Sequence, residues 1–244
     1  MAEKTTNKKE EQQKNTQPSE GFELLENPEA LQEQLDKTQA FINKHKSLIT
    51  KVLASVVGII VGMFFYNYYK DMRDQEAQVQ LFPAVFYFEK DSLDKAMQGD
   101  GNFTDGFAKI SEEYGLTKAG NLSNFYAGVI ALKKGDYDQA ITYLKDFSSD
   151  DYLLQARAYC LIGDAYVEKN DLSTAANYYE KAANYNPNPQ FTPTYLMKLG
   201  MVLEEKGDKE KAKDAYREIV TTFKKSSEFN EAKKALARLG EMVE

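Results

Sequence analysis

The chain has 244 residues, a formal net charge of −7, and charged side chains at 28% of its positions. Residues 1–47 carry seven lysines against nine carboxylates and Lys51 adds one positive charge, so six of the net negative charges lie beyond Lys51. So acidic a region excludes a nucleic-acid partner, because phosphate binding requires clustered Lys and Arg. The length suits one elongated helical domain rather than several globular ones.

The inventory of reactive side chains argues against catalysis. The sequence has one histidine, His45, and one cysteine, Cys160, on either side of an apolar segment. A Cys/His pair, a Ser/His/Asp triad and a His-rich metal site therefore cannot be assembled, and phosphate-binding glycine motifs are absent from the sequence. Carboxylate pairs such as Glu112-Glu113 lie in highly charged stretches, where solvation explains them. We expect a protein that is not an enzyme and uses no cofactor and no metal.

The N-terminal region is predicted to have two parts. Met1–Gly21 is rich in Lys, Glu, Gln, Thr and Asn and offers almost nothing to bury, and residues 1–27 are predicted to be a disordered cytoplasmic tail. Pro28 then suits the first turn of a juxtamembrane helix over residues 28–47. A narrow stripe follows this helix, formed by Leu31, Leu35, Thr38 and Ile42. The stripe fits a short contact helix or coiled coil. Because it is shorter than two heptads, a helix that only leads into the membrane segment is favoured.

Residues 48–69 are predicted to form a transmembrane helix. The run from Leu48 to Tyr66 would span about 28 Å as a helix, close to the thickness of a bilayer core. Aromatic residues gather at its far end, as in the interfacial belts of membrane proteins, at Phe64, Phe65, Tyr66, Tyr68 and Tyr69. A buried helix of a soluble protein is the alternative. A cleaved signal peptide fits poorly, because the run starts far from Met1 and no cleavage site follows it.

The charges that flank this helix predict its orientation. Uncompensated positive charge precedes or enters it at Lys44, Lys46 and Lys51, and Lys51 can reach the near interface with its long side chain. After the helix, each basic residue has an acidic neighbour, in Lys70-Asp71 and Arg73-Asp74. The positive-inside rule therefore places residues 1–47 in the cytoplasm and the C-terminal region on the other side.

Small residues form one face of the predicted span. Ala54, Gly58 and Gly62 lie four residues apart, and Gly58 to Gly62 is a GxxxG spacing that lets a second helix approach closely. The face fits docking of a membrane partner or of a second copy of the chain. The alternative is that these glycines have no such role, because glycine is common in membrane helices.

Residues 70–120 read as a helical region that precedes the main repeats. Two helices are expected, Gln75–Met97 and Phe103–Tyr114, separated by the breaker-rich residues 98–102. The second carries a stripe of Phe107, Ile110 and Tyr114, so the region could be a degenerate repeat.

The densest pattern lies between Ala156 and Pro189. Aromatic, small and helix-breaking residues recur there at fixed spacings, at Tyr159, Ile162, Gly163, Tyr166, Ala175, Tyr179, Ala182 and Pro187. The small residues let two helices approach closely, and Asn170-Asp171 supplies a turn between them. These positions resemble the consensus of the tetratricopeptide repeat (TPR) family. The resemblance implies a pair of antiparallel helices whose role is to hold another protein.

Two further copies of this pattern lie in register. Moving 35 residues back from Gly163 gives Gly128, and moving 37 residues forward gives Gly200. Both copies keep a turn at the corresponding place, at Gly135-Asp136 and at Gly207-Asp208. Because an isolated helix pair cannot bury its apolar face, we expect three stacked TPR repeats over residues 121–226.

Residues 227–244 are expected to close the stack. Apolar residues recur at helical spacing within Ser227–Val243, with Lys and Glu on the other side, which predicts a solvated capping helix. The predicted fold is thus all-α: a single N-terminal transmembrane helix followed by a TPR-type α-solenoid with a capping C-terminal helix.

The resemblance also implies where a partner binds. In the TPR family the first helix of each repeat lines a concave groove at its second, fifth, ninth and twelfth positions. Carried over by register, these are Leu122, Phe125, Val129, Leu132, Arg157, Cys160, Asp164, Val167, Thr194, Met197, Met201 and Glu204. The Lys and Asn residues with which some TPR domains clamp a C-terminal carboxylate are absent from these positions.

This lining is largely apolar and includes two pliable methionines, Met197 and Met201, which suits a helix or an unfolded apolar segment as the occupant. The alternative is that the upstream helices or the C-terminal helix fill the groove. As an unpaired cysteine, Cys160 is expected to have a buried packing role, with intermolecular pairing as the minor alternative.

The architecture as a whole, over about residues 45–244, resembles the ancillary subunit of the bacterial SecYEG translocon, the YfgM-type family. The resemblance implies a single-pass protein of the bacterial inner membrane with a periplasmic TPR domain. Its partners would be translocon subunits, exported chains and periplasmic chaperones. The long tail before His45 departs from that family and leaves room for a cytoplasmic contact. Three alternatives stay open: a scaffold for envelope or cell-division complexes, a homo-oligomer, and a eukaryotic organelle receptor.

Overall fold

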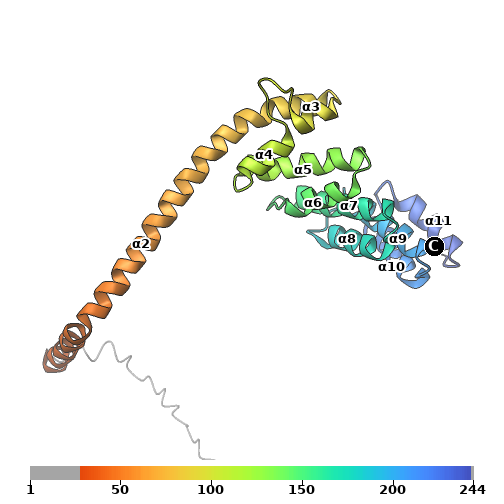
Figure 1. The fold of residues 1–244 in the computed structure, drawn as a ribbon. Helices are drawn as coiled ribbons and strands as arrows, with labels where there is room; N and C mark the ends of the chain where they lie inside the picture. Colours follow the sequence, from red (N-terminus) through yellow and green to blue (C-terminus); the bar gives the residue numbers. More distant parts are fainter. Residues whose placement is uncertain (1–27, 243–244) are drawn as a thin grey trace, which may run out of the picture. The chain divides into compact units, whose positions relative to one another are not determined.

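The computed structural model describes residues 28–242. Within them the secondary structure is helical, apart from one isolated bridge between Gly99 and Asp105 (Figure 1). The helices are α2 (Pro28–Glu89), α3 (Leu93–Gln98), α4 (Phe107–Tyr114), α5 (Lys118–Lys133), α6 (Tyr137–Asp146), α7 (Tyr152–Glu168), α8 (Leu172–Asn184), α9 (Thr192–Glu205), α10 (Lys209–Thr222) and α11 (Phe229–Arg238). The chain divides into two compact units between Phe65 and Tyr66. The tail predicted over residues 1–27 lies outside the described residues.

The helix α2 joins segments that the sequence analysis treated separately. It runs without interruption from the predicted juxtamembrane helix, through the predicted span, to Glu89. Within the described residues it is the helix long and apolar enough to cross a membrane, judged by length and composition. The side chains of its apolar window are not buried against other parts of the chain.

The region before the repeats folds into the end of α2, α3 and α4, and two predicted boundaries were wrong. The helix expected over Gln75–Met97 breaks at residues 90–92, because Asp91 takes a positive φ of 54° and the N–H of Ser92 donates to the Tyr87 carbonyl. The helix expected from Phe103 begins only at Phe107. The preceding loop is held by Asp100, whose Oδ1 accepts three backbone N–H bonds.

The end of α2 belongs to the second unit and packs there on α4 and α5. Ala84 is fully buried in a cluster with Phe107 and Ile110 of α4 and with residues of α5. Asp74 Oδ1 accepts the N–H of Ala119 at 2.9 Å, in the first turn of α5. This part of α2 is therefore a structural element of the helical stack.

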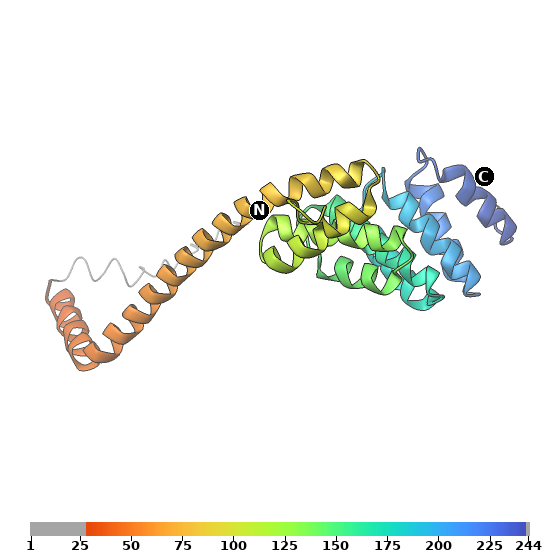
Figure 2. The same ribbon diagram turned by 45° about the horizontal axis from the view of Figure 1, so that its top comes forward.

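From α5 onward, consecutive helices lie side by side in both views (Figures 1 and 2). The same turn closes the first helix of each pair, with a positive φ at Gly135, Asn170 and Gly207. In each turn a backbone N–H donates to the carbonyl five residues earlier, in the bonds Asp136 to Ala131, Asp171 to Tyr166 and Asp208 to Leu203, at 2.8–2.9 Å. The three repeats thus share one backbone geometry.

Close contact between the helices of each pair occurs at a glycine. A Cβ added at Gly163 would lie 2.7 Å from a ring carbon of Tyr179, and one added at Gly200 would lie 2.3 Å from a ring carbon of Tyr216. The same contact in the first repeat is made between Gly128 and Leu144. In all three pairs the partner lies 16 residues after the glycine, so the predicted register corresponds to one packing arrangement.

The C-terminal helix α11 covers the last pair and is shorter than predicted. It runs over Phe229–Arg238 rather than Ser227–Val243, and Gly240 takes a positive φ of 84° just after it. Ala232, Ala235 and Leu236 are buried in the cluster that extends back to α7. The helix therefore closes the apolar core of the second and third repeats.

The glycine contact gives a direct prediction for stability. Gly200→Ala should lower the free energy of unfolding by about 1–3 kcal/mol, because the new methyl group overlaps the Tyr216 ring. In an open helix the same substitution would raise stability by about 1 kcal/mol. Denaturant unfolding of the full chain in detergent measures the change. A double-mutant cycle with Tyr216→Ala should show strong coupling, and simple additivity would contradict the proposed overlap.

Candidate interaction surface

The predicted groove residues lie on α5, α7 and α9 at spacings of three, four and three, so each set shares one helix face. We call this surface the helix-A face. On α5 its members are Leu122, Phe125, Val129 and Leu132, all partly exposed. Phe125, Val129 and Leu132 pack against the core cluster of α6 and α7, and the centre of the Phe125 ring lies 5.2 Å from that of Phe147. The α5 part of the face is therefore apolar and accessible.

On α7 the structure differs from the predicted set of groove residues in two ways. Cys160 is fully buried and offers nothing to a partner, as its expected packing role requires. Leu153 lies one turn before Arg157 on the same face and is 37% exposed, although the repeat register did not include it. Arg157 is exposed, and Val167 is half-buried against the core. The accessible part of α7 is thus its first half.

Asp164 is engaged inside the stack. Its Oδ1 accepts bonds from the Tyr179 hydroxyl and from Lys198 Nζ, both at 2.6 Å, so it joins α7 to α8 and to α9. The Lys198 ammonium also lies 5.7 Å from the centre of the Tyr179 ring. Burial, reinforced by the Asp164 carboxylate, raises the pKa of the Tyr179 hydroxyl. This residue therefore stabilises the stack rather than lining an open groove.

The third repeat contains a similar polar network. Glu204 accepts a bond from the Tyr216 hydroxyl at 3.2 Å and pairs with Arg238 of α11 at 2.9 Å. The bonds to Arg238 hold the pKa of Glu204 below its usual value. Thr194 donates to Glu228, just before α11, at 2.7 Å. The C-terminal segment thus occupies two of the four predicted positions on α9, which is the alternative occupant expected from the sequence.

The methionines of α9 differ in accessibility. Met197 is half-buried against the core, whereas Met201 is 56% exposed. In the first repeat, the positions equivalent to Tyr179 and Asp164 are Leu144 and Val129, so no polar pair forms there. The open apolar portion of the helix-A face consequently lies on α5 and the first half of α7, with Met201 further along.

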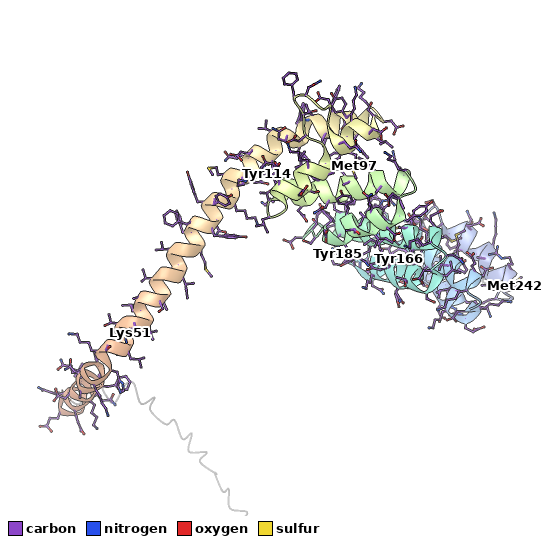
Figure 3. The ribbon with its side chains drawn as sticks, in the orientation of Figure 1. Lys51, Met97, Tyr114, Tyr166, Tyr185 and Met242 are labelled. Atoms are coloured by element: carbon purple, nitrogen blue, oxygen red, sulfur yellow. The ribbon has the colours of Figure 1, made fainter. Side chains whose placement is uncertain are left out.

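A second surface, which the sequence analysis missed, lies between α6 and α8. It is a cleft of about 560 Å³. Its rim and walls include Lys145, Tyr159, Tyr178, Lys181 and Tyr185, and we call it the tyrosine–lysine cleft. The Lys181 ammonium lies 4.9 Å from the centre of the Tyr178 ring. Figure 3 labels Tyr185, which lines the cleft, and Tyr166, whose ring stacks on that of Tyr178.

The cleft between α8 and α10 occupies the equivalent place one repeat later. It measures about 310 Å³ and has Leu196, Leu199 and Leu203 on its wall. The positions equivalent to Lys145 and Lys181 are Glu180 and Glu218, so the charge is reversed at these two positions, while Lys206 and Lys211 line other parts of the second cleft. The repeat pattern gave no signal for the tyrosine–lysine cleft, because Tyr159 is its one consensus tyrosine and Tyr178, Tyr185 and the two lysines lie outside the consensus positions. Within the described residues, no cluster of His, Cys, Asp or Glu is placed to hold a metal ion.

Comparison with known proteins supports the repeat assignment. The Tetratricopeptide repeat-like domain family matches residues 39–237. The uncharacterized protein ycf37 of Guillardia theta is 35% identical over 115 residues, which make up 46% of this chain, and the match spans 63% of that relative's length. The crystal structure of MamA superposes with a TM-score of 0.52 at 20% identity, covering 64% of this chain and 81% of the other. The expectation of an all-helical TPR-like solenoid is therefore confirmed.

The buried position of Cys160 predicts that its thiol is unreactive. Burial raises the pKa of Cys160 to about 12, with a smaller contribution from Asp164. At pH 8 the thiolate population should be about a thousandfold below that of an ordinary cysteine, so the folded chain should resist maleimide while the denatured chain reacts at once. Mass spectrometry of labelled protein measures both rates. Rapid labelling of the folded chain would place Cys160 on an open surface instead.

Proposed function

The chain belongs to the tetratricopeptide repeat-like domain family, and we propose that it is a membrane-anchored adaptor that holds protein partners on its repeats. Repeat proteins of this type are generally scaffolds for binding rather than enzymes, because stacked helix pairs create extended surfaces. The proposal therefore assigns the chain a role in bringing proteins together at a membrane.

The open apolar part of the helix-A face carries this proposal. Leu122, Phe125 and Leu153 expose apolar surface there, and Met201 extends it onto α9. Leucine, phenylalanine and methionine side chains fit the apolar stripe of a helix or an unfolded apolar segment. The polar networks at Asp164 and Glu204 limit the proposed binding surface to this portion.

The proposed anchor is residues 48–69 of α2. The apolar run, Lys51 near one end and the aromatic residues at the other support a single span, with residues 1–47 in the cytoplasm. The second unit would then lie in the periplasm of a bacterial inner-membrane protein. Ala54, Gly58 and Gly62 would form the face on which a membrane partner packs.

The most specific form of the proposal is an ancillary role in protein export. An anchored TPR stack beside the translocon would take apolar segments of emerging chains onto the helix-A face and pass them to periplasmic chaperones. The apolar, partly exposed lining of α5 supports this over recognition of a charged chain end. A scaffold of envelope or cell-division complexes is the outcome that a test must distinguish.

Photocrosslinking in living cells tests the proposed partners. A benzoylphenylalanine at Leu153 or Met201, both exposed, should capture exported chains or chaperones, and one at Gly58 should capture translocon subunits. Mass spectrometry identifies the crosslinked proteins. Crosslinks confined to division or envelope proteins would replace the export proposal with the scaffold.

A matched pair of variants tests the binding surface. Leu153→Glu should reduce co-purification of the partner about tenfold, because it places a charge in an apolar contact. The neighbouring Tyr152 is similarly exposed but lies about 100° away around α7, so Tyr152→Glu should leave binding unchanged. Equal effects of the two substitutions would remove the helix-A face from the proposal.

Single cysteines test the orientation, in a Cys160→Ala background. A membrane-impermeant maleimide should label Phe103→Cys from the periplasmic side, because Phe103 is 92% exposed in the second unit. Leu35→Cys should be labelled only after the inner membrane is opened. The reverse pattern would invert the topology, and labelling of both sites in intact spheroplasts would rule out a span.

A further inference from the structure

The portion of α2 in the second unit is apolar on two opposite sides. Ala77 and Ala84 are fully buried toward α4 and α5. On the other side Val79 is 72%, Phe82 76% and Phe86 50% exposed. A helix that is apolar all round is normally buried all round, and contiguous exposed apolar residues mark an interaction site. Within the described residues the outer side of this helix is therefore left exposed, which indicates a contact with another molecule.

The exposed residues follow a seven-residue repeat. Met72, Val79 and Phe86 lie seven apart, and Tyr68, Gln75 and Phe82 form a second series offset by three. We call these six residues the outer stripe. Alternating steps of three and four along one helix are the pattern by which two parallel helices pair. Pro83 lies beside the stripe without ending α2, so the stripe is helical throughout.

The bilayer is a poor candidate to cover the outer stripe. Phe82 lies 13 residues beyond Tyr69, the last residue of the proposed span, which is about 20 Å along the helix. An upright helix would carry Val79, Phe82 and Phe86 well past the interface. Tyr68 lies at the end of the proposed span, but the part of the stripe from Val79 to Phe86 is too far along the helix to be covered by the same bilayer.

Charge favours a second copy of the same chain as the partner. Residues 77–88 contain no Asp, Glu, Lys, Arg or His, although 28% of the chain is charged. The region beyond Lys51 carries six net negative charges, so two copies repel each other over most of their surfaces. Along the uncharged outer stripe, two copies can approach without this electrostatic repulsion. In sequence, its seven-residue series also continues to Phe65 and to Gly58 of the predicted packing face.

We propose that the outer stripe pairs with the outer stripe of a second copy, giving a parallel two-helix contact between two anchored chains. A parallel arrangement follows from two identical spans in one membrane, so this part rests on the proposed anchor. The contact leaves the helix-A face uncovered, because the stripe is on the side of α2 opposite the buried residues. Each assembly would present two TPR stacks, and a client with two apolar segments could bind both at once.

Disulfide trapping in native membranes tests the proposal. The full chain carries Cys160→Ala together with either Phe82→Cys on the stripe or Gln78→Cys as a control. Gln78 is exposed about one helical turn before Phe82 and takes a flanking position outside the stripe. Residues facing each other in a parallel pair come within disulfide distance, whereas flanking positions do not. Mild oxidation should convert Phe82→Cys into a homodimer and leave Gln78→Cys monomeric. No homodimer, equal yields at the two sites, or an adduct with a different protein would overturn the proposal.

A second variant separates loss of pairing from loss of folding. Phe82→Lys should raise the dissociation constant of the dimer in detergent about tenfold or more, measured by light scattering, because it removes a buried aromatic and adds a charge. The thermal unfolding of each chain should not change, since Phe82 is exposed in the single chain. An unchanged dissociation constant would contradict the pairing. Partner capture at Leu153 reports on the adaptor function, so failure of one proposal is distinguishable from failure of the other.

Discussion

The structure depends on one contact, the approach of a glycine on the first helix of each pair to a large side chain on the second. At Gly163 and Gly200 the partner is a tyrosine ring, and at Gly128 it is Leu144. The absence of a Cβ lets the helices come close enough to bury a continuous core from α5 to α11. That spacing also determines which residues of the first helices remain on the surface. The accessible face is therefore a consequence of the packing.

Repetition does not make the three repeats equivalent. The tyrosines of the second and third repeats bring hydroxyl groups to the edge of the core, where Asp164 and Glu204 accept their bonds and pair with Lys198 and Arg238. Leu144 has no hydroxyl group, so the first repeat needs no such acceptor and keeps an apolar surface at Val129. One substitution in the core thus accompanies a change from an internally paired face to an open one.

The sequence predicted those features that recur at a fixed spacing. The repeat glycines and the turns at Gly135, Asn170 and Gly207 follow from local chemistry. Features that depend on contacts between distant residues escaped it. The pairing of Asp164 with Lys198, for example, joins residues 34 apart. The break at residues 90–92 was missed for a different reason, because its turn bonds are local but interrupt an otherwise helical pattern. The tyrosine–lysine cleft was missed because Tyr178, Tyr185 and the two lysines lie outside the repeat pattern and come together only when the helices stack.

The helix α2 would connect the membrane to the repeats by using different faces for different tasks. Ala77 and Ala84 belong to the core of the stack, while Val79 and Phe82 are left for an external contact.

The central claim is that a protein partner occupies the helix-A face over α5 and the start of α7. Cryo-electron microscopy of the complex isolated from native membranes without crosslinker tests this most directly. The account predicts partner density against Leu122, Phe125 and Leu153. A partner bound only at the tyrosine–lysine cleft, with the helix-A face empty, would contradict it.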